Sequence, residues 1–302
     1  MHTLFIHSPA IAGLKKLPLL FIFTISLVCF FNKSWGCTNP PNATETYQDT
    51  ELTNHPPKKI SLKFNKTLRA EDLLHHYGNN YICLTDKMSH ENPGDLLPLD
   101  LVVDSHEGFI PLWKEDSKLR WTFDESSLGF FDNAEEIKTH VREYFDQAVK
   151  KWGSSLPVTF SENPEVWDFE IRIEPNNSCM NGGCVLARAF FPDSGRHYFS
   201  IFPMWFDLND IEEIIRVLLH EIGHISGLRH SFAPEKEINW PSEIFGVQRP
   251  FTIMNYGNKS KLTRQDKLDL QNLYKAAWNG RLTEIDGIPI KFVRPFHELS
   301  YH

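Results

Sequence analysis

The stretch LLHEIGHISGLRHS (residues 218–231) begins as an apolar helix pattern and then carries three imidazoles and a glycine: His220, His224, Gly227 and His230. His220 and His224 are four residues apart, so on a helix they share one face, about one turn from each other. His230 would point elsewhere on a continued helix, and it can join the other two only if the chain turns back. Gly227 stands where that turn is needed, because glycine adopts positive φ at little steric cost. The stretch therefore predicts two ligands on a helix, a glycine break and a third ligand on the returning chain.

Three imidazoles suit Zn²⁺ and leave its fourth tetrahedral position open for water. Glu221 follows the first ligand and occupies the general-base position of an HExxH helix. A carboxylate there can take a proton from a zinc-bound water and pass it to a leaving amine. We therefore expect one catalytic Zn²⁺ on His220, His224 and His230, with Glu221 as the base. Two alternatives stay open: an ordinary amphipathic helix with solvated histidines, and a three-histidine site without catalysis.

The N-terminal residues predict export. Lys15 and Lys16 precede the apolar run LPLLFIFTISLVCFF (17–31), and cleavage after Gly36 would complete a secretory signal spanning residues 1–36. We expect a secreted, extracellular protein. The alternative is an uncleaved signal anchor, which would attach the protein to a membrane. Candidate glycosylation sequons begin at Asn42, Asn65, Asn176 and Asn258.

Four cysteines remain after the signal, and an even count in an exported chain favours disulfides. The short loop CMNGGC (179–184) favours a Cys179–Cys184 pair, and a Cys37–Cys83 pair follows by elimination. Two free thiols or a metal clip remain alternatives for the first pair.

The chain has 302 residues, 41% of them hydrophobic, and a net charge of −8. This composition allows one good-sized core, and its acidity argues against nucleic-acid binding.

We expect a polar leader with a pro-segment or accessory fold at 37–112, a catalytic domain at 113–279 and a tail at 280–302 that contains little periodic signal. Within the domain the pattern predicts strands at 118–124, 156–162, 168–175, 184–192 and 197–203, and helices at 133–153 (with a capping-box-like start at Asn133), 209–227 and 263–278. That order predicts an α+β fold.

The zinc motif with a downstream methionine, Met254 in TIMNYG, resembles the metzincin signature. Ser231 after the third histidine, LARAFFP (186–192) and LTRQDKLDLQNLY (262–274) resemble the matrixins, the matrix-metalloproteinase family. The resemblance implies a twisted, mostly parallel five-stranded sheet, an active-site helix, a closing C-terminal helix, and a turn that places Met254 under the zinc. It also implies endopeptidase activity on an extended substrate that pairs with the edge strand LARAFF (186–191).

Several features depart from the matrixin pattern. The turn reads MNYG, so Tyr256 resembles the astacin and serralysin tyrosine that helps stabilise the oxyanion; a packed aromatic is the alternative. The interval from His230 to Met254 is longer than in typical matrixins. The structural-zinc triplet HGD is absent, which leaves His197 as one lone resemblance and a second Zn²⁺ or a Ca²⁺ as an open question. The PRCGxPD switch is also absent, and Cys83 is the upstream thiol that could replace it.

Together these features predict a secreted, monomeric zinc endopeptidase that acts on extracellular proteins. The alternative is a secreted or signal-anchored zinc-binding protein on the same fold, with a binding role and little proteolysis.

Overall fold

The computed structural model describes residues 60–63, 80–82, 101–105, 108–180, 183–231, 233, 242–245, 252–255 and 260–299. All of them belong to the part of the chain that spans Asn54–His302. Among these residues, no helix has the length and apolar character needed to span a bilayer.

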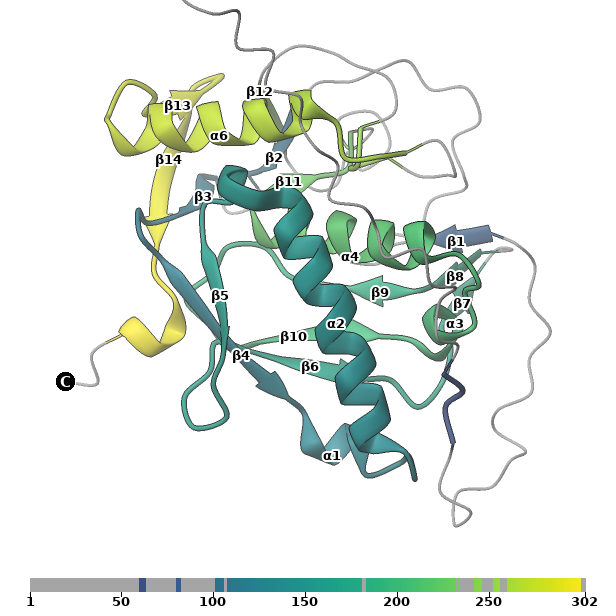
Figure 1. Ribbon diagram of the computed structural model, residues 1–302. Helices are drawn as coiled ribbons and strands as arrows, with labels where there is room; N and C mark the ends of the chain where they lie inside the picture. Colours follow the sequence, from purple (N-terminus) through teal and green to yellow (C-terminus); the bar gives the residue numbers. More distant parts are fainter. Residues whose placement is uncertain are drawn as a thin grey trace, which may run out of the picture. The chain divides into compact units, whose positions relative to one another are not determined.

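A five-stranded sheet with strand order β5-β4-β6-β10-β9 forms the centre of the fold (Figure 1). The first four strands run parallel to their neighbours, and β9 at the edge runs antiparallel to β10. Apolar residues alternate along β6, where Phe169, Ile171 and Ile173 are buried, as the two-residue period of a strand requires. The predicted mostly parallel sheet is confirmed. The strands are β4 Lys118–Phe123, β5 Thr159–Glu162, β6 Phe169–Ile173, β9 Ala187–Arg188 and β10 His197–Ile201.

Helix α2 (Ala134–Trp152) crosses in front of this sheet (Figure 1) and fixes the next long helix, α4 (Ile211–Ile225). Its Phe145 ring packs edge-on against Trp121 of β4 and Phe199 of β10, with centroids 5.6 and 5.9 Å apart. At its end, the indole Nε1 of Trp152 donates to the carbonyl of Leu219 on α4 at 3.0 Å. Helix α4 is thereby tied to the sheet through α2. Short helical turns lie at α1 Glu125–Leu128, η2 Gly153–Ser155 and α3 Pro203–Phe206.

The start of α2 contacts the leader region, which corrects the expected capping box. The Asn133 side chain makes no capping hydrogen bond to the helix backbone. The expected contact with Glu136 is present, because the Asn133 Nδ2 donates to the Glu136 Oε2 at 3.1 Å. The Asn133 Oδ1, however, accepts the Lys63 N–H at 3.0 Å, and its Nδ2 also donates to the Ser61 carbonyl at 3.1 Å. Ile60, just before, is buried. The amide that could have capped the helix therefore holds residues 60–63.

Two further leader segments form strands. Strand β1 (Asn80–Ile82) pairs in parallel with β8 (Gly183–Val185), which forms a hairpin with β7 (Cys179–Met180). The predicted Cys179–Cys184 disulfide is present in that hairpin. Strand β2 (Leu101–Asp104) is the centre of a separate three-stranded sheet, between β11 (Leu228–Arg229) and β12 (Ser242–Phe245).

The C-terminal part of the chain closes the fold. Helix α6 (Arg264–Trp278) starts at a capping box between Thr263 and Asp266. The chain then forms a hairpin of β13 (Glu284–Ile285) and β14 (Ile288–Val293), and β14 pairs in parallel with β3 (Ile110–Trp113). The tail is thus structured although its sequence contains little periodic signal.

A final turn, η3 (Phe296–Glu298), is held against the sheet by a buried carboxylate. Asp168 accepts the backbone N–H groups of Arg120 at 2.7 Å and His297 at 2.9 Å, and the His297 Nδ1 lies 3.0 Å from it. The Arg196 guanidinium lies beside two rings, 4.9 Å from Trp167 and 4.5 Å from Phe296. These contacts attach the last described residues to the start of β6.

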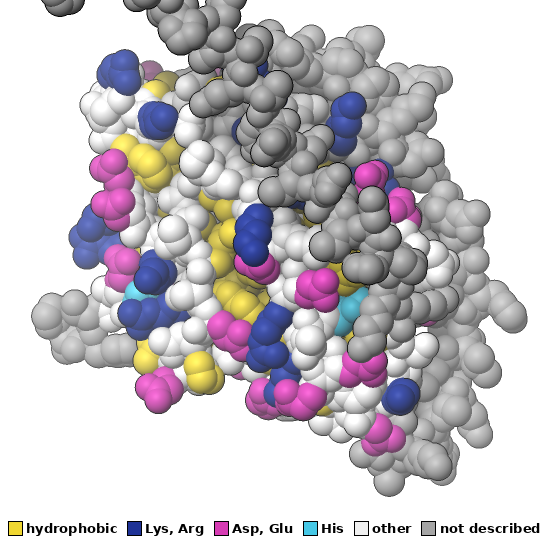
Figure 2. Space-filling view, in the orientation of Figure 1, with side chains coloured by type: hydrophobic (Ala, Val, Ile, Leu, Met, Phe, Trp, Pro, Cys, Tyr) yellow, Lys and Arg dark blue, Asp and Glu magenta, His cyan; other side chains and the backbone are white. Residues whose placement is uncertain are grey.

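On the face seen in Figure 2, acidic and basic side chains are interspersed around a band of hydrophobic atoms. Among the solvent-accessible charged residues of the protein, Arg142 and Glu162 form an ion pair at 2.7 Å. Exposed pairs of this kind contribute about 0–1 kcal/mol, so they affect solubility more than stability.

Candidate active site

Helix α4 carries two of the three predicted ligands on its buried side. It begins after Asp210, whose carboxylate caps the first turn, and it presents His220 and His224 one turn apart, with ring centroids separated by 4.8 Å. Gly227 then adopts a φ of +90°, a left-handed value that favours glycine. The chain reverses there into β11, which leads directly to His230.

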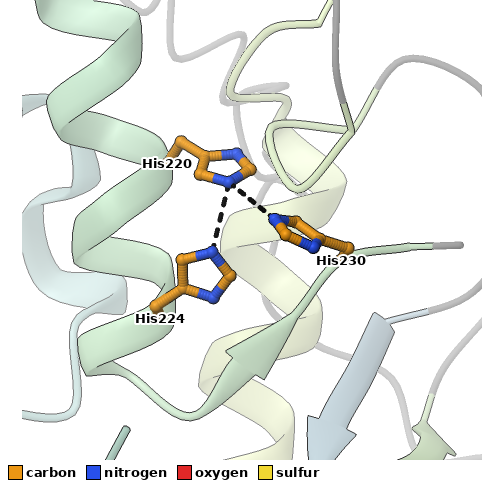
Figure 3. Close-up of side chains that lie close together, drawn as sticks. All are labelled: His220, His224 and His230. Carbon is orange, nitrogen blue, oxygen red and sulfur yellow. Dashed lines mark hydrogen bonds between the residues drawn. The ribbon is translucent and has the colours of Figure 1, made fainter. Parts of the chain in front are cut away.

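The three imidazoles converge (Figure 3). The Nε2 of His220 lies 3.2 Å from the Nε2 of His224 and 3.2 Å from the Nε2 of His230. All three side chains are buried, and their ligand atoms lie within 4.8 Å of one another. The two histidines on α4 and the histidine on the returning chain thus meet, as their spacing predicted.

Backbone carbonyls orient two of these rings. The Nδ1 of His220 lies 2.8 Å from the Ile253 carbonyl oxygen, and the Nδ1 of His224 lies 2.7 Å from that of Leu228. A carbonyl oxygen can only accept a hydrogen bond, so each Nδ1 carries a proton, and in the neutral imidazole each Nε2 then keeps its lone pair. The lone pairs of His220 and His224 therefore face each other, an arrangement that is repulsive until a cation is shared between them.

This donor set fits zinc. A tetrahedral Zn²⁺ with Zn–N bonds of about 2.0–2.1 Å holds its nitrogen ligands roughly 3.3 Å apart. The two 3.2 Å separations match that spacing. Neutral imidazoles with a hydrogen-bonded second nitrogen are also the usual form of zinc-ligating histidines. The three histidines form a zinc site.

Glu221 follows His220 on α4 and is 2% exposed. A carboxylate buried beside metal ligands is shielded from bulk water, which strengthens its interactions with charges at the site. Its place on the helix is that of the general base in HExxH enzymes.

Met254 lies against α4 between the two helical ligands. A Cβ built on Gly223 would overlap the Met254 Sδ, so the glycine leaves the space that the methionine occupies. The Met254 carbonyl also accepts the N–H of Ser231, the residue after the third ligand, at 2.9 Å. The turn therefore contacts both the helix and the returning chain.

Strand β9, within the LARAFF segment, forms one edge of the central sheet and contacts α4. One side of β9 pairs with β10, and no strand in the described part of the chain pairs with its other side. An extended peptide could add to this edge beside the zinc helix.

Residues 113–275, more than half of the chain, match the Matrixin family model (Peptidase_M10). The chain belongs to the matrixin family.

Stromelysin-3 of Xenopus laevis is 31% identical over 149 residues, which are 46% of this chain and 29% of that protein. Metalloendoproteinase 4-MMP of Arabidopsis thaliana is 28% identical over 182 residues, 54% of this chain and 48% of that protein. This matrixin thus spans less than half the length of these curated relatives. Among solved structures, the crystal structure of myroilysin matches with a TM-score of 0.40 and 13% identity, covering 71% of this chain and 99% of that chain.

Residues far from the motif support the matrixin site, and sequence patterns assigned them no role there. The Trp113 indole donates to the Ile225 carbonyl at 2.6 Å, and the Tyr274 hydroxyl donates to the Ser226 carbonyl at 3.1 Å. Burial raises the pKa of Tyr274, so this hydroxyl stays protonated. The two side chains satisfy carbonyls at the end of α4, just before the turn at Gly227. No local pattern could have identified them, because each comes from a distant segment.

The described residues contain one group of three or more histidine, cysteine or acidic side chains placed to hold an ion, and it is the zinc triad. His197 does not belong to such a group. Its ring stacks on Phe190 at 4.4 Å, its Nε2 lies 3.9 Å from the Asp193 carboxylate, and burial lowers its pKa. One imidazole and one carboxylate do not make a structural zinc or calcium site.

Some predicted residues lie outside the described part of the chain. These are Tyr256, Cys37, Cys83 and the sequons at Asn42, Asn65 and Asn258. Their roles stay predictions. Asn176, the remaining sequon, is described and exposed.

Proposed function

We propose that this matrixin is a secreted zinc-dependent endopeptidase that hydrolyses peptide bonds of extracellular proteins. The observation that carries the proposal is the convergence of the His220, His224 and His230 Nε2 atoms at zinc-ligand spacing beside the buried Glu221.

When bound, the metal supplies Lewis acidity to a substrate carbonyl and to a water molecule. His220, His224 and His230 would hold it. Glu221 takes the proton that the attacking water releases and returns it to the leaving amine. We also assign the Tyr256 hydroxyl as a donor to the oxyanion that develops on the carbonyl.

The substrate would lie extended along β9. Strand addition at a sheet edge supplies main-chain hydrogen bonds that do not depend on side-chain identity. One side of β9 pairs with no strand among the described residues, and β9 contacts α4; both observations support this placement. We propose protein or peptide substrates on these grounds, bound by a monomer.

Export is part of the proposal and rests on the signal-like residues 1–36. N-terminal sequencing of the protein from the medium of expressing cells tests it. We expect a start at or after Cys37, whereas a cell-bound protein that retains residues 17–31 would contradict secretion.

The test of the activity compares two Glu→Gln changes on the same helix. The full chain, Glu221→Gln and Glu212→Gln are assayed for zinc content and for casein or gelatin hydrolysis. Glu212 is an exposed residue in the first turn of α4, so it controls for the loss of a carboxylate. We expect all three proteins to hold zinc and Glu221→Gln alone to lose activity, by roughly 10² to 10⁴.

Near-normal turnover by Glu221→Gln would remove the general base from the mechanism. A wild-type chain that holds zinc and hydrolyses no protein or peptide substrate would favour the zinc-binding protein instead.

A further inference from the structure

We propose that Asp104 is a positioning residue for the zinc site, acting through Arg229, and that β2 belongs to the catalytic unit and is not part of a removable pro-segment. This inference deepens the proposed function, because it concerns the same zinc site. It assigns a role to residues that sequence patterns placed in the leader.

Strand β2 is buried on both faces. Val102 and Val103 point to opposite sides of the strand and are 1% and 0% exposed. Asp104 and Ser105, which follow, are also buried. A strand buried on both faces is part of a core, and removing it would expose apolar surface on both sides.

Strand β2 pairs with the chain between the second and third ligands. Val103 pairs with Leu228 and Val102 with Arg229, and the Asp104 N–H donates to the Gly227 carbonyl at 3.2 Å. Leu228 is the residue whose carbonyl orients the His224 ring. The position of that carbonyl, and with it the direction of one metal ligand, therefore depends on β2.

A buried ion pair strengthens this contact next to the third ligand. The Arg229 Nη1 lies 3.4 Å from the Asp104 Oδ1, and the two side chains are 2% and 10% exposed. The same guanidinium lies 5.8 Å from the centre of the Phe191 ring, which packs edge-on against His224 at 5.4 Å. Asp104 thus holds the guanidinium of Arg229 in place. This guanidinium lies beside Phe191, the ring that packs on His224, and Arg229 directly precedes His230 in the chain.

The other side of β2 pairs with β12, which lies in the long interval between His230 and Met254. The sheet β11-β2-β12 therefore joins the ligand loop to the segment that leads to the methionine turn. The residues just before the third ligand and residues 242–245 within the interval are thus hydrogen-bonded to the same central strand.

Removing one member of a buried ion pair takes away part of the electrostatic stabilisation of the other charge in a region of low dielectric. The guanidinium of Arg229 would then move toward water and displace the loop that holds His230. Outer-shell changes of this kind weaken metal binding by about 10-fold to 100-fold.

The experiment measures zinc affinity by competition with a chromogenic chelator, well below the unfolding temperature, in the full chain. The variants are Asp104→Asn, Arg229→Met and the double variant. Asp124→Asn is the matched control, because Asp124 forms an ion pair with Arg172 at 2.8 Å, away from the histidines. Thermal unfolding is recorded for each protein, so that a change in zinc affinity is separated from a general loss of stability.

We expect Asp104→Asn to weaken zinc binding by about 10-fold to 100-fold. Asp124→Asn should lower the unfolding temperature and leave zinc affinity unchanged. The double variant should bind zinc better than Asp104→Asn, since it leaves no lone buried charge. If Asp104→Asn does not fold, the double variant tests the positioning role in its place. We then expect the double variant to bind zinc several-fold more weakly than wild type.

Wild-type zinc affinity in Asp104→Asn, or in the double variant when the single variant is not folded, would overturn the positioning role. N-terminal sequencing of the zinc-bound, proteolytically active species tests the second part of the proposal. We expect it to begin before Leu101, and a start after Ser105 would overturn the assignment of β2. Zinc affinity is measured without substrate, so a chain that binds zinc but cleaves no protein refutes the proposed activity and not the positioning role of Asp104.

Discussion

Met254 and Gly223 fit together so closely that a side chain at position 223 would occupy the space of the methionine sulphur. Met254 is 2% exposed, and the surrounding atoms restrict where its thioether can move. The glycine inside the zinc motif is therefore explained by packing: it allows the turn after the third ligand to lie directly against the ligand helix.

We expect Gly223→Ala to destabilise the protein by about 1–3 kcal/mol, the usual cost of adding a methyl group to a filled core. Met254→Ala alone should cost about 2–5 kcal/mol through the cavity it leaves. In the double variant the new methyl enters that cavity, so its cost should be less than the sum of the single effects. Denaturant unfolding of all four proteins gives these values, and simple additivity would contradict the contact.

The third ligand can be tested by His230→Ala. Two histidines on one helix remain in that variant, and zinc affinity should fall steeply because one of three protein donors is lost. Metal analysis after dialysis against a weak chelator measures it. Full zinc retention would show that His230 is not a ligand.

Tyr256 distinguishes the two family patterns. If its hydroxyl stabilises the transition state, Tyr256→Phe should lower kcat by about 10-fold to 100-fold with little change in KM, because the bond exists only in the transition state. Zinc content should stay normal, since the ring is retained. An unchanged kcat in the folded variant would identify Tyr256 as a packed aromatic.

Asp168→Ala tests the attachment of the C-terminal turn. The substitution leaves the backbone N–H groups of Arg120 and His297 without their acceptor, at a cost of about 1–3 kcal/mol for each group that stays buried. Asp146→Ala is the control, because Asp146 pairs with Lys150 on the exposed side of α2 and should contribute less than about 1 kcal/mol. Equal unfolding temperatures for the two variants would argue against a structural role for the tail.

Sequence could predict the parts of this fold in which apolar or ligand residues recur with the period of a helix or a strand. The stripe of α2, the alternation of β6 and the ligand spacing of α4 each repeat over a few residues, and the central sheet and zinc triad are confirmed. At Asn133 the contact with Glu136 is present, but the expected cap of the helix backbone was wrong, because residues 61–63 of a distant segment bind the same amide.

Pairing between distant segments was beyond local patterns. The position of β2 between β11 and β12 depends on residues more than a hundred positions away in the chain. The hydrogen bond from Trp113 to Ile225 is equally non-local. Tertiary contacts of this kind decide where a short strand or an aromatic side chain lies, and they leave no periodic trace in sequence.

The parallel pairing of β3 with β14 joins residues 110–113 to residues 290–293. Trp113, at the end of β3, also donates to the last turn of the zinc helix. During synthesis, β3 leaves the ribosome long before its partner, and loop closure over so much chain is slow. One edge of β3 therefore stays unpaired in the newly made protein until residues 290–293 have been translated. This order of events would delay the final form of the zinc site until well after its three histidines have been made.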